Sequence, residues 1–446
     1  MSRIDDFLQT FARFGVHLGL EASFALLEAL GNPQKRVPIL HVAGSNGKGS
    51  VCTYLSAVLT EAGYRVGRYT SPHLIDWSER IYLNEEPIAE ADLWAALQKV
   101  KAAIPPEGPS PTQFEVLTAA MWVYFAQRRV DVAVIEVGLG GRLDATNVVD
   151  KPLVSIITSI SLEHTERLGD TLAKIAFEKA GILKENCPAL IGEMPEEAAA
   201  VISRCAYDRF CPTLYPQPAK DCGNGWASYA SLEIYELEEG EVALLPREFT
   251  FQLPLQGAVQ LKNVSLAIAA LQILRQESWK IPDRAIIHGI AKTRWPGRLQ
   301  WYTWQRHRIL IDGAHNPDSA LVLRQFVDEC LTRAKDEQSR VHWVMGVLAT
   351  KNHREMLETL LRSRDSLYLV PIPDHKSADL PQLAHLACQV VCPHLAHSGI
   401  YEDVQLGLKA AIERAEPADL VVLCGSLYLL GHFFAQEKRS PTQPDD

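Results

Sequence analysis

The chain has 446 residues, of which 47% are hydrophobic and 22% charged, a composition ordinary for a water-soluble globular enzyme of two or three domains. Its formal net charge of −10 argues against a general nucleic-acid binder, because such a protein needs a basic face to neutralise phosphates. No apolar run reaches the ~18–20 residues of a membrane span, and the N-terminus lacks the apolar core of a secretory signal, so we expect a cytoplasmic protein.

Strand-like apolar runs alternate with helical segments through the first half of the chain. In chain order, the patterns predict a strand at 37–44, a helix at 48–62, a strand at 64–71, helices at 90–103 and 112–128, strands at 130–138 and 152–160, a helix at 171–181 and a strand at 188–193. Continuous apolar strands separated by helices are typical of a parallel sheet covered on both faces, so this half predicts an α/β domain.

The pattern changes between about 207 and 260, where mixed, turn-rich sequence predicts a smaller antiparallel piece. Helices resume at 261–276 and 282–292, and the Pro-Gly break in "TRWPGRLQ" marks a domain boundary. A second α/β series follows, with strands in "HRILIDGAH", "VHWVMGVL", "SLYLVPI" and "ADLVVLCGS" and helices at 317–332, 352–362, 380–391 and after the last strand. We therefore predict one domain at 1–295, a smaller one at 296–440 and a flexible tail at 441–446.

The segment "HVAGSNGKGS" (41–50) places a glycine-rich turn between a strand and a helix, as in a phosphate-binding loop. Gly44, Gly47 and Gly49 let backbone N–H groups approach phosphate closely, and Lys48 can reach the β- and γ-phosphates. The alternative is a glycine-rich turn without a ligand, and Gly44 lies closer to Gly47 than in the standard loop. Gly49 also stands where that loop has the hydroxyl residue that holds Mg²⁺. We predict an ATP site whose metal ligands come from elsewhere.

Three polar residues that follow apolar strands are the predicted metal ligands. Glu136 ends the strand "VDVAVIEVG", Ser71 follows "RVGRY", and His164 follows "LVSIITSI". Because ligands gather at the carboxyl ends of parallel strands, we expect these side chains to lie beside Lys48 and to hold one or two Mg²⁺ ions, with Mn²⁺ tolerated by the imidazole. The alternative for Glu136 is a buried salt bridge.

The loop "LIDGAHNPDSA" (310–320) opens the second α/β series. Asp312 and His315 flank a turn into a helix that has Pro317 near its first turn. The loop is interpreted either as a helix cap or, with Arg298 of the linker, as a polar clamp from the second domain.

Two further motifs resemble cofactor or metal sites, but we predict that neither binds one. The turn "EVGLGGRLDATN" (136–147) mimics a dinucleotide fingerprint, but Leu143 stands where the third glycine belongs, so we reject nicotinamide binding. The cluster "HLACQVVCPHLAH" lacks the usual zinc spacing, and Cys388 and Cys392 are better interpreted as part of a buried helix stripe. Cys52, Cys187, Cys330 and Cys424 stand alone in apolar stretches and are expected to be reduced core thiols.

Nine motifs in order resemble those of the folylpolyglutamate synthase family, which is related to the Mur ligases, over nearly the whole chain. They are "HVAGSNGKGS", "SPHL" followed by "ERI", "TQFEVLTAAM", "EVGLGGRLDATN", "EHT", "EKAGILK", "PGR", "DGAHNP" and "CGSLYLLG". The resemblance implies an α/β protein with an N-terminal P-loop ATPase domain, built on a mostly parallel sheet, and a smaller C-terminal Rossmann-like domain. Ser45 replaces a more usual threonine, Glu163 stands where aspartate is commoner, and Ser161 where bifunctional relatives often have alanine.

The resemblance also implies residue roles. ATP is expected at Gly44, Asn46, Gly47, Lys48, Gly49, Ser50, Asn263, Arg298 and Asp312, Mg²⁺ at Ser71, Glu136 and His164, and the pterin or folate at Thr112, Gln113, Phe114, Glu115, Leu143, Asp144 and Ala145. Lys179 matches a family lysine that carries a CO₂-derived carbamate, although the sequence by itself predicts a solvated helix residue there. The predicted catalytic residues are Lys48, Lys179, Asp312 and His315.

The implied reaction is the ATP-dependent addition of L-glutamate to folates, and to dihydropteroate to make dihydrofolate, through an acyl phosphate. Lys48 and Mg²⁺ are expected to stabilise the negative charge on the phosphoryl group during its transfer. The two domains are expected to close around ATP by hinging near Trp295–Arg298. Three alternatives stay open: a folylpolyglutamate synthase only, a Mur-type ligase acting on a UDP-sugar peptide, and a P-loop switch ATPase. Mur ligases place threonine where this chain has Gly49, and the sequence before the loop is short for a UDP-sugar domain. We expect a monomer without nucleic-acid or membrane partners.

Overall fold

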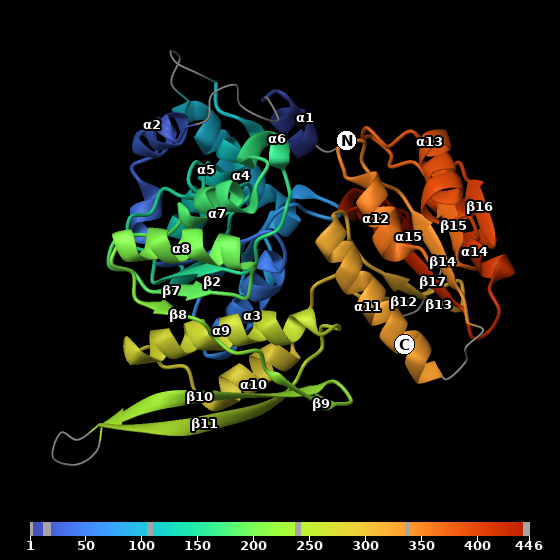
Figure 1. Cartoon of the computed structure of the whole chain (residues 1–446). Helices are drawn as coiled ribbons and strands as arrows, with labels where there is room; N and C mark the ends of the chain where they lie inside the picture. The colour runs from blue at the N-terminus through green and yellow to red at the C-terminus, as the bar shows by residue number, and fades with distance from the viewer. Residues whose placement is uncertain (1–2, 12–18, 105–109, 237–241, 335–338, 440–446) are drawn as a thin grey trace. The chain divides into compact units, whose positions relative to one another are not determined.

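The structure, a computed structural model, describes residues 3–11, 19–104, 110–236, 242–334 and 339–439 (Figure 1). The predicted tail at 441–446 lies outside the described residues. The chain forms two compact units, and the first consists of Met1–Pro72, Trp77–Pro254 and Val259–Arg294. The second consists of His73–Asp76, Leu255–Ala258 and Trp295–Asp446, so it takes two short segments from within the first part of the chain.

An eight-stranded sheet forms the centre of the first unit. Its strands are β1 (Ile39–Ala43), β2 (Val66–Tyr69), β3 (Ile81–Leu83), β4 (Glu86–Pro87), β5 (Val132–Glu136), β6 (Val154–Ile157), β7 (Ala189–Ile191) and β8 (Thr213–Leu214), in the order β4-β3-β2-β5-β1-β6-β7-β8. The strands from β2 to β8 in this order pair in parallel, and β3 and β4 add an antiparallel edge. Strands β1, β5 and β6 are buried along their whole length, as their continuous apolar sequence predicts.

Helices cover this sheet and bury its apolar faces. They are α1 (Arg3–Gln9), α2 (Glu21–Ala29), α3 (Lys48–Glu61), α4 (Glu90–Ala103), α5 (Gln113–Arg128), α6 (Thr165–Leu168), α7 (Leu172–Ala180), α8 (Glu196–Asp208), α9 (Val259–Gln276) and α10 (Asp283–Ala291). Between α8 and α9, a three-stranded antiparallel sheet is made of β9 (Lys220–Gly223), β10 (Trp226–Glu236) and β11 (Val242–Gln252). Figure 1 shows it beside α9 and α10, in the region where the turn-rich sequence predicts an antiparallel piece.

The second unit is built on a six-stranded sheet of the order β12-β13-β17-β14-β15-β16. Its elements are β12 (Gln300–Trp304), β13 (His307–Ile311), α11 (Pro317–Ala334), β14 (Val341–Met345), α12 (His353–Leu360), β15 (Ser366–Leu369), α13 (Leu380–His385), a π-helical segment (Leu386–Val391), β16 (His397–Ile400), α14 (Val404–Arg414), β17 (Leu420–Cys424) and α15 (Leu427–Arg439). Among the described strands of this sheet, β12 pairs with β13 in antiparallel fashion and the others pair in parallel. Two core clusters of buried apolar side chains fill the unit.

The α/β class with a large, mostly parallel sheet is therefore confirmed. The patterns did not predict the short strands β3, β4, β8, β12 and β16 or the helices α2, α6, α8 and α14, and the single helix expected at 380–391 is divided into α13 and a π-helical segment. Short edge strands bury little apolar surface, so they carry a weak sequence pattern. In the described part of the chain no helix is long and apolar enough to cross a membrane.

Candidate active site

The predicted phosphate loop lies between the carboxyl end of β1 and the first turn of α3. Gly44 and Gly47 have positive φ angles of 147° and 85°, and Gly47 caps α3. A Cβ atom at Gly44 would lie 1.9 Å from Thr158 Oγ1, and one at Gly47 would lie 2.5 Å from Asn263 Oδ1. Both positions therefore require glycine, and the predicted nucleotide residue Asn263 is packed directly against the loop.

A second loop, after β6, fixes the phosphate loop in place. The backbone N–H of Ser45 donates to the carbonyl of Ser159 at 2.7 Å, and the N–H of Asn46 donates to Ser159 Oγ at 3.1 Å. The N–H of Ser161 donates to Ser45 Oγ at 3.0 Å, a bond that alanine at position 161 would keep. The loop is thus held in a defined shape by its neighbour, which lowers the entropy lost when a phosphate binds.

Lys48 lies over its own loop and is partly exposed. Its Nζ donates to the carbonyl oxygens of Gly44 at 2.8 Å and of Ser45 at 3.0 Å. Among the described residues no carboxylate forms an ion pair with Lys48, so its positive charge is available to an anionic ligand.

Lys179 is buried, and the expectation of a solvated helix residue is wrong. It is 2% exposed, and its Nζ donates to Glu163 Oε1 at 2.8 Å and to the Gly44 carbonyl at 2.9 Å. Burial raises the pKa of the Glu163 carboxyl, but the cations of Lys179 and Lys48 outweigh burial and hold that pKa at about 2. Burial lowers the pKa of the Lys179 amine even though Glu163 opposes the shift. A buried ion pair therefore lies directly against the phosphate loop.

Two of the three predicted metal ligands lie together. Glu136, the last residue of β5, is 4% exposed, and its Oε2 accepts a hydrogen bond from the backbone N–H of Ser71 at 3.3 Å. Glu136 is in register with Val42 of β1, two residues before the phosphate loop. His164 is exposed on a separate loop, beside Glu163, with a left-handed φ of 48° at the start of α6.

These donors suit a hard divalent cation. The buried Glu136 carboxylate offers an oxygen ligand of the kind that Mg²⁺ and Mn²⁺ prefer, and Ser71, whose backbone bonds to it, carries a hydroxyl of the same kind. The described residues contain no group of three or more His, Cys, Asp or Glu side chains arranged to hold a metal ion by themselves. A cation at Glu136 would therefore complete its coordination with the hydroxyl of Ser71, with water or with phosphate oxygens.

The start of helix α5 lies in residues 112–115, the first of two segments expected to bind the pterin or folate. Because this substrate receives the glutamate, it is called the acceptor below, and the two segments are called acceptor segments. Thr112 caps this helix in a capping box, in which its N–H donates to Glu115 Oε2 at 2.7 Å and its Oγ1 accepts from the N–H of Glu115 at 3.2 Å. The ring of Phe114 lies over Gly138, where a Cβ atom would be 2.4 Å from it, and 6.0 Å from the Tyr69 ring. Phe114 thus lies at the carboxyl ends of β2 and β5, while Gln113 is partly exposed on the first turn.

The second predicted acceptor segment lies in the loop at 138–147. Asp144 is 5% exposed, and its carboxylate accepts from the N–H of Leu139 at 2.8 Å and from the N–H and Oγ1 of Thr146 at 3.0 and 2.6 Å. Burial raises the pKa of Asp144, and these hydrogen bonds oppose the shift. Leu143 is partly exposed and Ala145 buried. Asp144 therefore shapes its own loop, and its contact with a pterin stays a prediction.

His41 is a residue that the sequence patterns missed. It lies 1% exposed in the middle of β1, and its Nε2 is 2.9 Å from Thr146 Oγ1. Burial, aided by the charge of Lys184, lowers its pKa from 6.5 to about 3, so the ring is neutral at neutral pH. The signal that could have identified it is a polar residue within the otherwise apolar strand "ILHVA".

The buried His41 ring predicts a loss of stability in acid. The unfolded chain binds this proton near pH 6.5 and the folded chain only near pH 3, so acidification between these values favours unfolding by up to about 1.4 kcal/mol per pH unit. His41→Gln lacks this titration and should have the flatter dependence of unfolding free energy on pH in that window. Chemical unfolding at pH 7, 6 and 5 measures it, and parallel curves for both proteins would contradict the prediction.

In the second unit, the "PGR" turn and the "DGAHNP" loop form one structure. Asp312 is 7% exposed, and its carboxylate accepts from the N–H groups of Leu299 and Ala314, both at 2.8 Å. Burial raises the pKa of Asp312, and the nearby Arg298 guanidinium opposes the shift. His315 Nδ1 lies 2.9 Å from the Gly313 carbonyl. Asp312, Arg298 and His315 are thus brought together at the carboxyl end of β13.

The cysteines, all within the described residues, form no disulfide. All nine are free, with Cys52, Cys187 and Cys424 buried as expected and Cys330 only partly buried. In the described part of the chain, the side chains of the "HLACQVVCPHLAH" cluster do not form a group of three or more potential metal ligands. Cys392 is buried at the end of the π-helical segment, which agrees with a packing role, but Cys388 is only partly buried, so the predicted buried stripe holds for Cys392 alone.

Known protein families and individual relatives match this chain over most of its length. The family described as "Mur ligase middle domain" matches residues 42–271, and the family described as "Dihydrofolate synthetase, C-terminal domain" matches residues 298–436. A folylpolyglutamate synthase from Lacticaseibacillus casei is 36% identical over 417 residues, covering 91% of each chain.

Solved structures share the fold over the same length. E. coli FolC in complex with DHPP and ADP has a TM-score of 0.79 and 31% identity, covering 98% of this chain and 99% of that one. A bifunctional folylpolyglutamate synthase/dihydrofolate synthase from Yersinia pestis, complexed with AMPPNP and Mn ion, has a TM-score of 0.78 and 30% identity, with 98% of each chain covered. Both are proteins to which this chain is similar in both units.

Proposed function

The chain belongs to the folylpolyglutamate synthase and dihydrofolate synthase family, and on that premise we propose that it joins L-glutamate to folates and to dihydropteroate while converting ATP to ADP. The observation that carries the proposal is the braced glycine loop with Lys48 at its end, in a chain that matches an ADP-bound relative almost from end to end. The protein is an ATP-dependent, amide-forming ligase of the Mur ligase family.

The chain's own groups account for the first chemical step. The acceptor carboxylate attacks the γ-phosphorus of ATP, which makes an acyl phosphate and releases ADP. The negative charge that develops on the phosphoryl oxygens meets the Lys48 ammonium and the N–H groups at the start of α3. Because the loop is already fixed by Ser159 and Ser161, these donors need little reorganisation as the charge moves.

In the second step, the amine of L-glutamate attacks the acyl phosphate, and phosphate leaves as the amide forms. Water competes for the same carbon, so the site must exclude it. We propose that Asp312 and His315 act on the nucleotide and the intermediate, as the family resemblance implies. Their fixed positions in the second unit support a preorganised group of side chains there.

The divalent metal belongs to the same proposal. Glu136 and Ser71 would hold it, with His164 as the third ligand that the resemblance implies. When bound, such a cation neutralises phosphate charge. Its use is supported by the Mn ion in the Yersinia relative and by the buried carboxylate found here.

Glu136→Gln should raise the Mg²⁺ concentration needed for half-maximal turnover at least about tenfold. The amide keeps the shape of the side chain and can still accept the Ser71 N–H, but it lacks the charge that attracts the cation. A Mg²⁺ titration of glutamate-dependent ADP release measures the effect. Glu61→Gln, on the far end of α3 where Glu61 pairs with Lys292, is the control and should titrate as the wild type does. An unchanged titration for Glu136→Gln would remove Glu136 from the metal site.

Lys179 is the proposed carbamate carrier. A neutral amine adds to CO₂ to give a carbamate and release one proton, so the reaction needs the uncharged form of the lysine. Burial lowers the pKa of Lys179 from its usual value, which favours the uncharged form. The carbamate would turn the cation beside Gly44 into an anion suited to orient metal-bound groups.

The test of the function is an assay of ADP release with dihydropteroate and with tetrahydrofolate as separate acceptors. Turnover with both, dependent on glutamate, is the expected result. Turnover with tetrahydrofolate alone would reduce the function to folylpolyglutamate synthase. Turnover only with a UDP-sugar peptide would indicate a Mur-type ligase, and hydrolysis without glutamate would indicate a switch ATPase.

The finer expectations of a cytoplasmic monomer belong to the same proposal. Light scattering coupled to size exclusion measures the assembly state, and a dimer mass would overturn the monomer.

A further inference from the structure

A chain of buried hydrogen bonds connects strand β1 with the loop at 138–147. His41 Nε2 lies 2.9 Å from Thr146 Oγ1, and Thr146 Oγ1 donates to Asp144 Oδ1 at 2.6 Å. The other carboxylate oxygen of Asp144 accepts from the Leu139 N–H at 2.8 Å. His41 and Thr146 are 1% and 0% exposed, so water does not compete for these bonds.

The number of protons fixes the direction of each bond. The Thr146 hydroxyl has one proton, which it gives to the Asp144 carboxylate, so the remaining partner of its oxygen must be a donor. His41 therefore carries its proton on Nε2 and donates to Thr146. The ring is neutral at neutral pH, so it contributes a hydrogen bond and no charge. That hydrogen bond holds the Thr146 hydroxyl in place.

The two ends of this hydrogen-bond chain lie in the two loops that the reaction uses. His41 lies three residues before Gly44, in the strand that leads into the phosphate loop. At the other end, Asp144 holds the turn that begins just after Glu136 and contains the predicted acceptor segment. A separate connection between the same loops runs through α7, where Lys179 donates to Gly44 and the N–H of Arg142 donates to the Glu178 carbonyl at 2.7 Å.

We propose that His41 and Thr146 are positioning residues, which hold the loop at 138–147 in register with the phosphate loop and thereby set the affinity for the acceptor substrate. The inference rests on the proposed function, because the family resemblance behind that function implies that Leu143, Asp144 and Ala145 bind the pterin or folate. Neither His41 nor Thr146 needs to touch a substrate, since each acts through Asp144.

Thr146→Val removes the hydroxyl at nearly constant volume and should raise the KM for the acceptor about tenfold, the effect of one lost buried hydrogen bond. The KM for ATP should stay within about twofold, because the phosphate loop keeps its own bonds to Ser159 and Ser161. Thr146→Ser keeps the hydroxyl and should restore the acceptor KM. The matched control is Ser155→Ala, which removes another buried hydroxyl, bonded to the Ile182 carbonyl at 2.9 Å, from the position of β6 paired with His41.

A second pair of variants carries the same test if Thr146→Val does not fold. His41→Gln keeps an N–H donor and should resemble the wild type, while His41→Leu removes it and should raise the acceptor KM as Thr146→Val does. An acceptor KM unchanged in His41→Leu and Thr146→Val would overturn the proposal. Equal rises in the KM values for ATP and acceptor, or no rescue by Thr146→Ser, would also overturn it by indicating a merely structural role.

Hydrogen exchange separates this inference from the proposed function. Amide exchange in a peptide covering 138–147 should speed up in Thr146→Val and not in Ser155→Ala, whether or not a folate is turned over. If the wild type used no folate but showed this difference, the proposed function would fail while the link between the loops stood. If exchange were unchanged while the wild type glutamylated folates, only the link would fail.

Discussion

Replacing Lys48 with methionine is expected to lower glutamate-dependent turnover about 10³-fold while leaving the protein folded. Methionine keeps the length of the side chain but removes the charge that meets the transferring phosphoryl group. The fold should tolerate the change, because Lys48 is bonded only to the carbonyls of Gly44 and Ser45 and is partly exposed. The lost hydrogen bonds are each worth about 1 kcal/mol of unfolding free energy.

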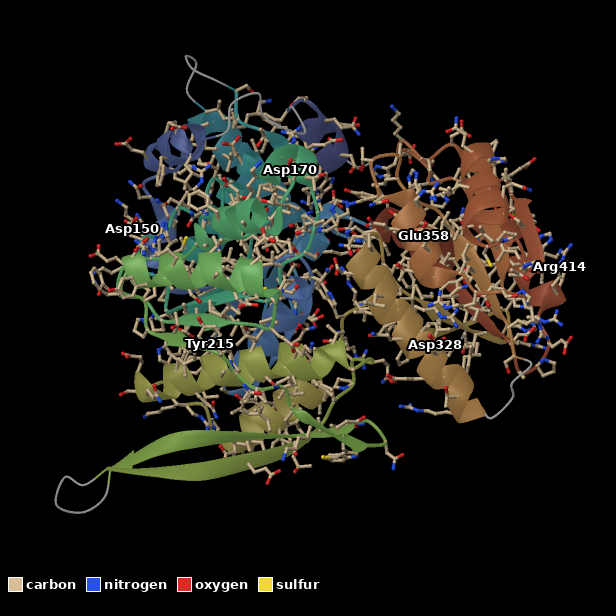
Figure 2. The ribbon with its side chains drawn as sticks, viewed as in Figure 1. Asp150, Asp170, Tyr215, Asp328, Glu358 and Arg414 are labelled. Carbon is tan, nitrogen blue, oxygen red and sulfur yellow. The ribbon has the colours of Figure 1, made fainter. Side chains whose placement is uncertain are left out.

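The measurement is ADP release under saturating ATP, glutamate and acceptor, together with thermal unfolding. The matched control is Lys174→Met, since Lys174 is a surface lysine of α7 whose Nζ pairs with Asp170 at 2.7 Å. Asp170 is labelled in Figure 2. We expect that control to keep wild-type turnover. A Lys48→Met enzyme within tenfold of the wild type would show that the loop lysine does not stabilise the transferring phosphate.

The buried pair of Lys179 and Glu163 leads to the second large effect, on both stability and activity. Lys179→Met leaves the Glu163 carboxylate buried without its partner. Glu163→Gln likewise leaves the Lys179 ammonium buried without a carboxylate. Each single change should lower the unfolding free energy by about 3–5 kcal/mol. The double variant Lys179→Met/Glu163→Gln removes both charges and should recover most of that loss, because the two groups are bonded to each other at 2.8 Å.

Turnover separates a structural lysine from a functional one. We expect the double variant to be stable and still inactive, because neither an ammonium nor a carbamate can form at position 179. If activity returned together with stability, the role of Lys179 would be structural alone. Rescue of Lys179→Ala by added acetate, with no rescue by methylammonium, would support the carbamate.

The contribution of the Lys179–Glu163 pair to the free energy of unfolding also depends on pH in a defined way. The pKa of Glu163 is lowered from 4.5 to about 2 in the folded protein, so its contribution to stability is fully present above pH 4.5 and is lost as pH falls toward 2. The loss therefore lies at more acidic pH than most of the loss that His41 predicts, and the two can be measured separately.

Sequence patterns were sufficient to predict the strand, turn and helix that carry the phosphate loop and the strand that ends at Glu136. The glycines of the phosphate loop are required by positive φ angles and close contacts, and Glu136 is identified by its place at the end of an apolar strand. The glycine-rich turn between a strand and a helix, and the acid at the end of an apolar run, can each be read from a few consecutive residues, whereas the contacts that require Gly44 and Gly47 come from the distant residues Thr158 and Asn263.

Features that depend on distant contacts could not be predicted in this way. Lys179 stands after Glu178 in a helix of mixed polarity, and its burial is explained only by Glu163 and the Gly44 carbonyl, which reach it from two other loops. The role of His41 depends likewise on Thr146, which lies 105 positions further along the chain.

The two segments that the second unit takes from the first part of the chain limit how the protein can be divided. Leu74, in the segment His73–Asp76, packs against a core cluster of the second unit, and its carbonyl lies where a side chain at Gly431 would have to be. A fragment that begins at Trp295 would therefore lack part of its own core. Chimaeras between relatives should exchange His73–Asp76 and Leu255–Ala258 together with the C-terminal part, because a single crossover at the linker would combine a core with segments from a different parent.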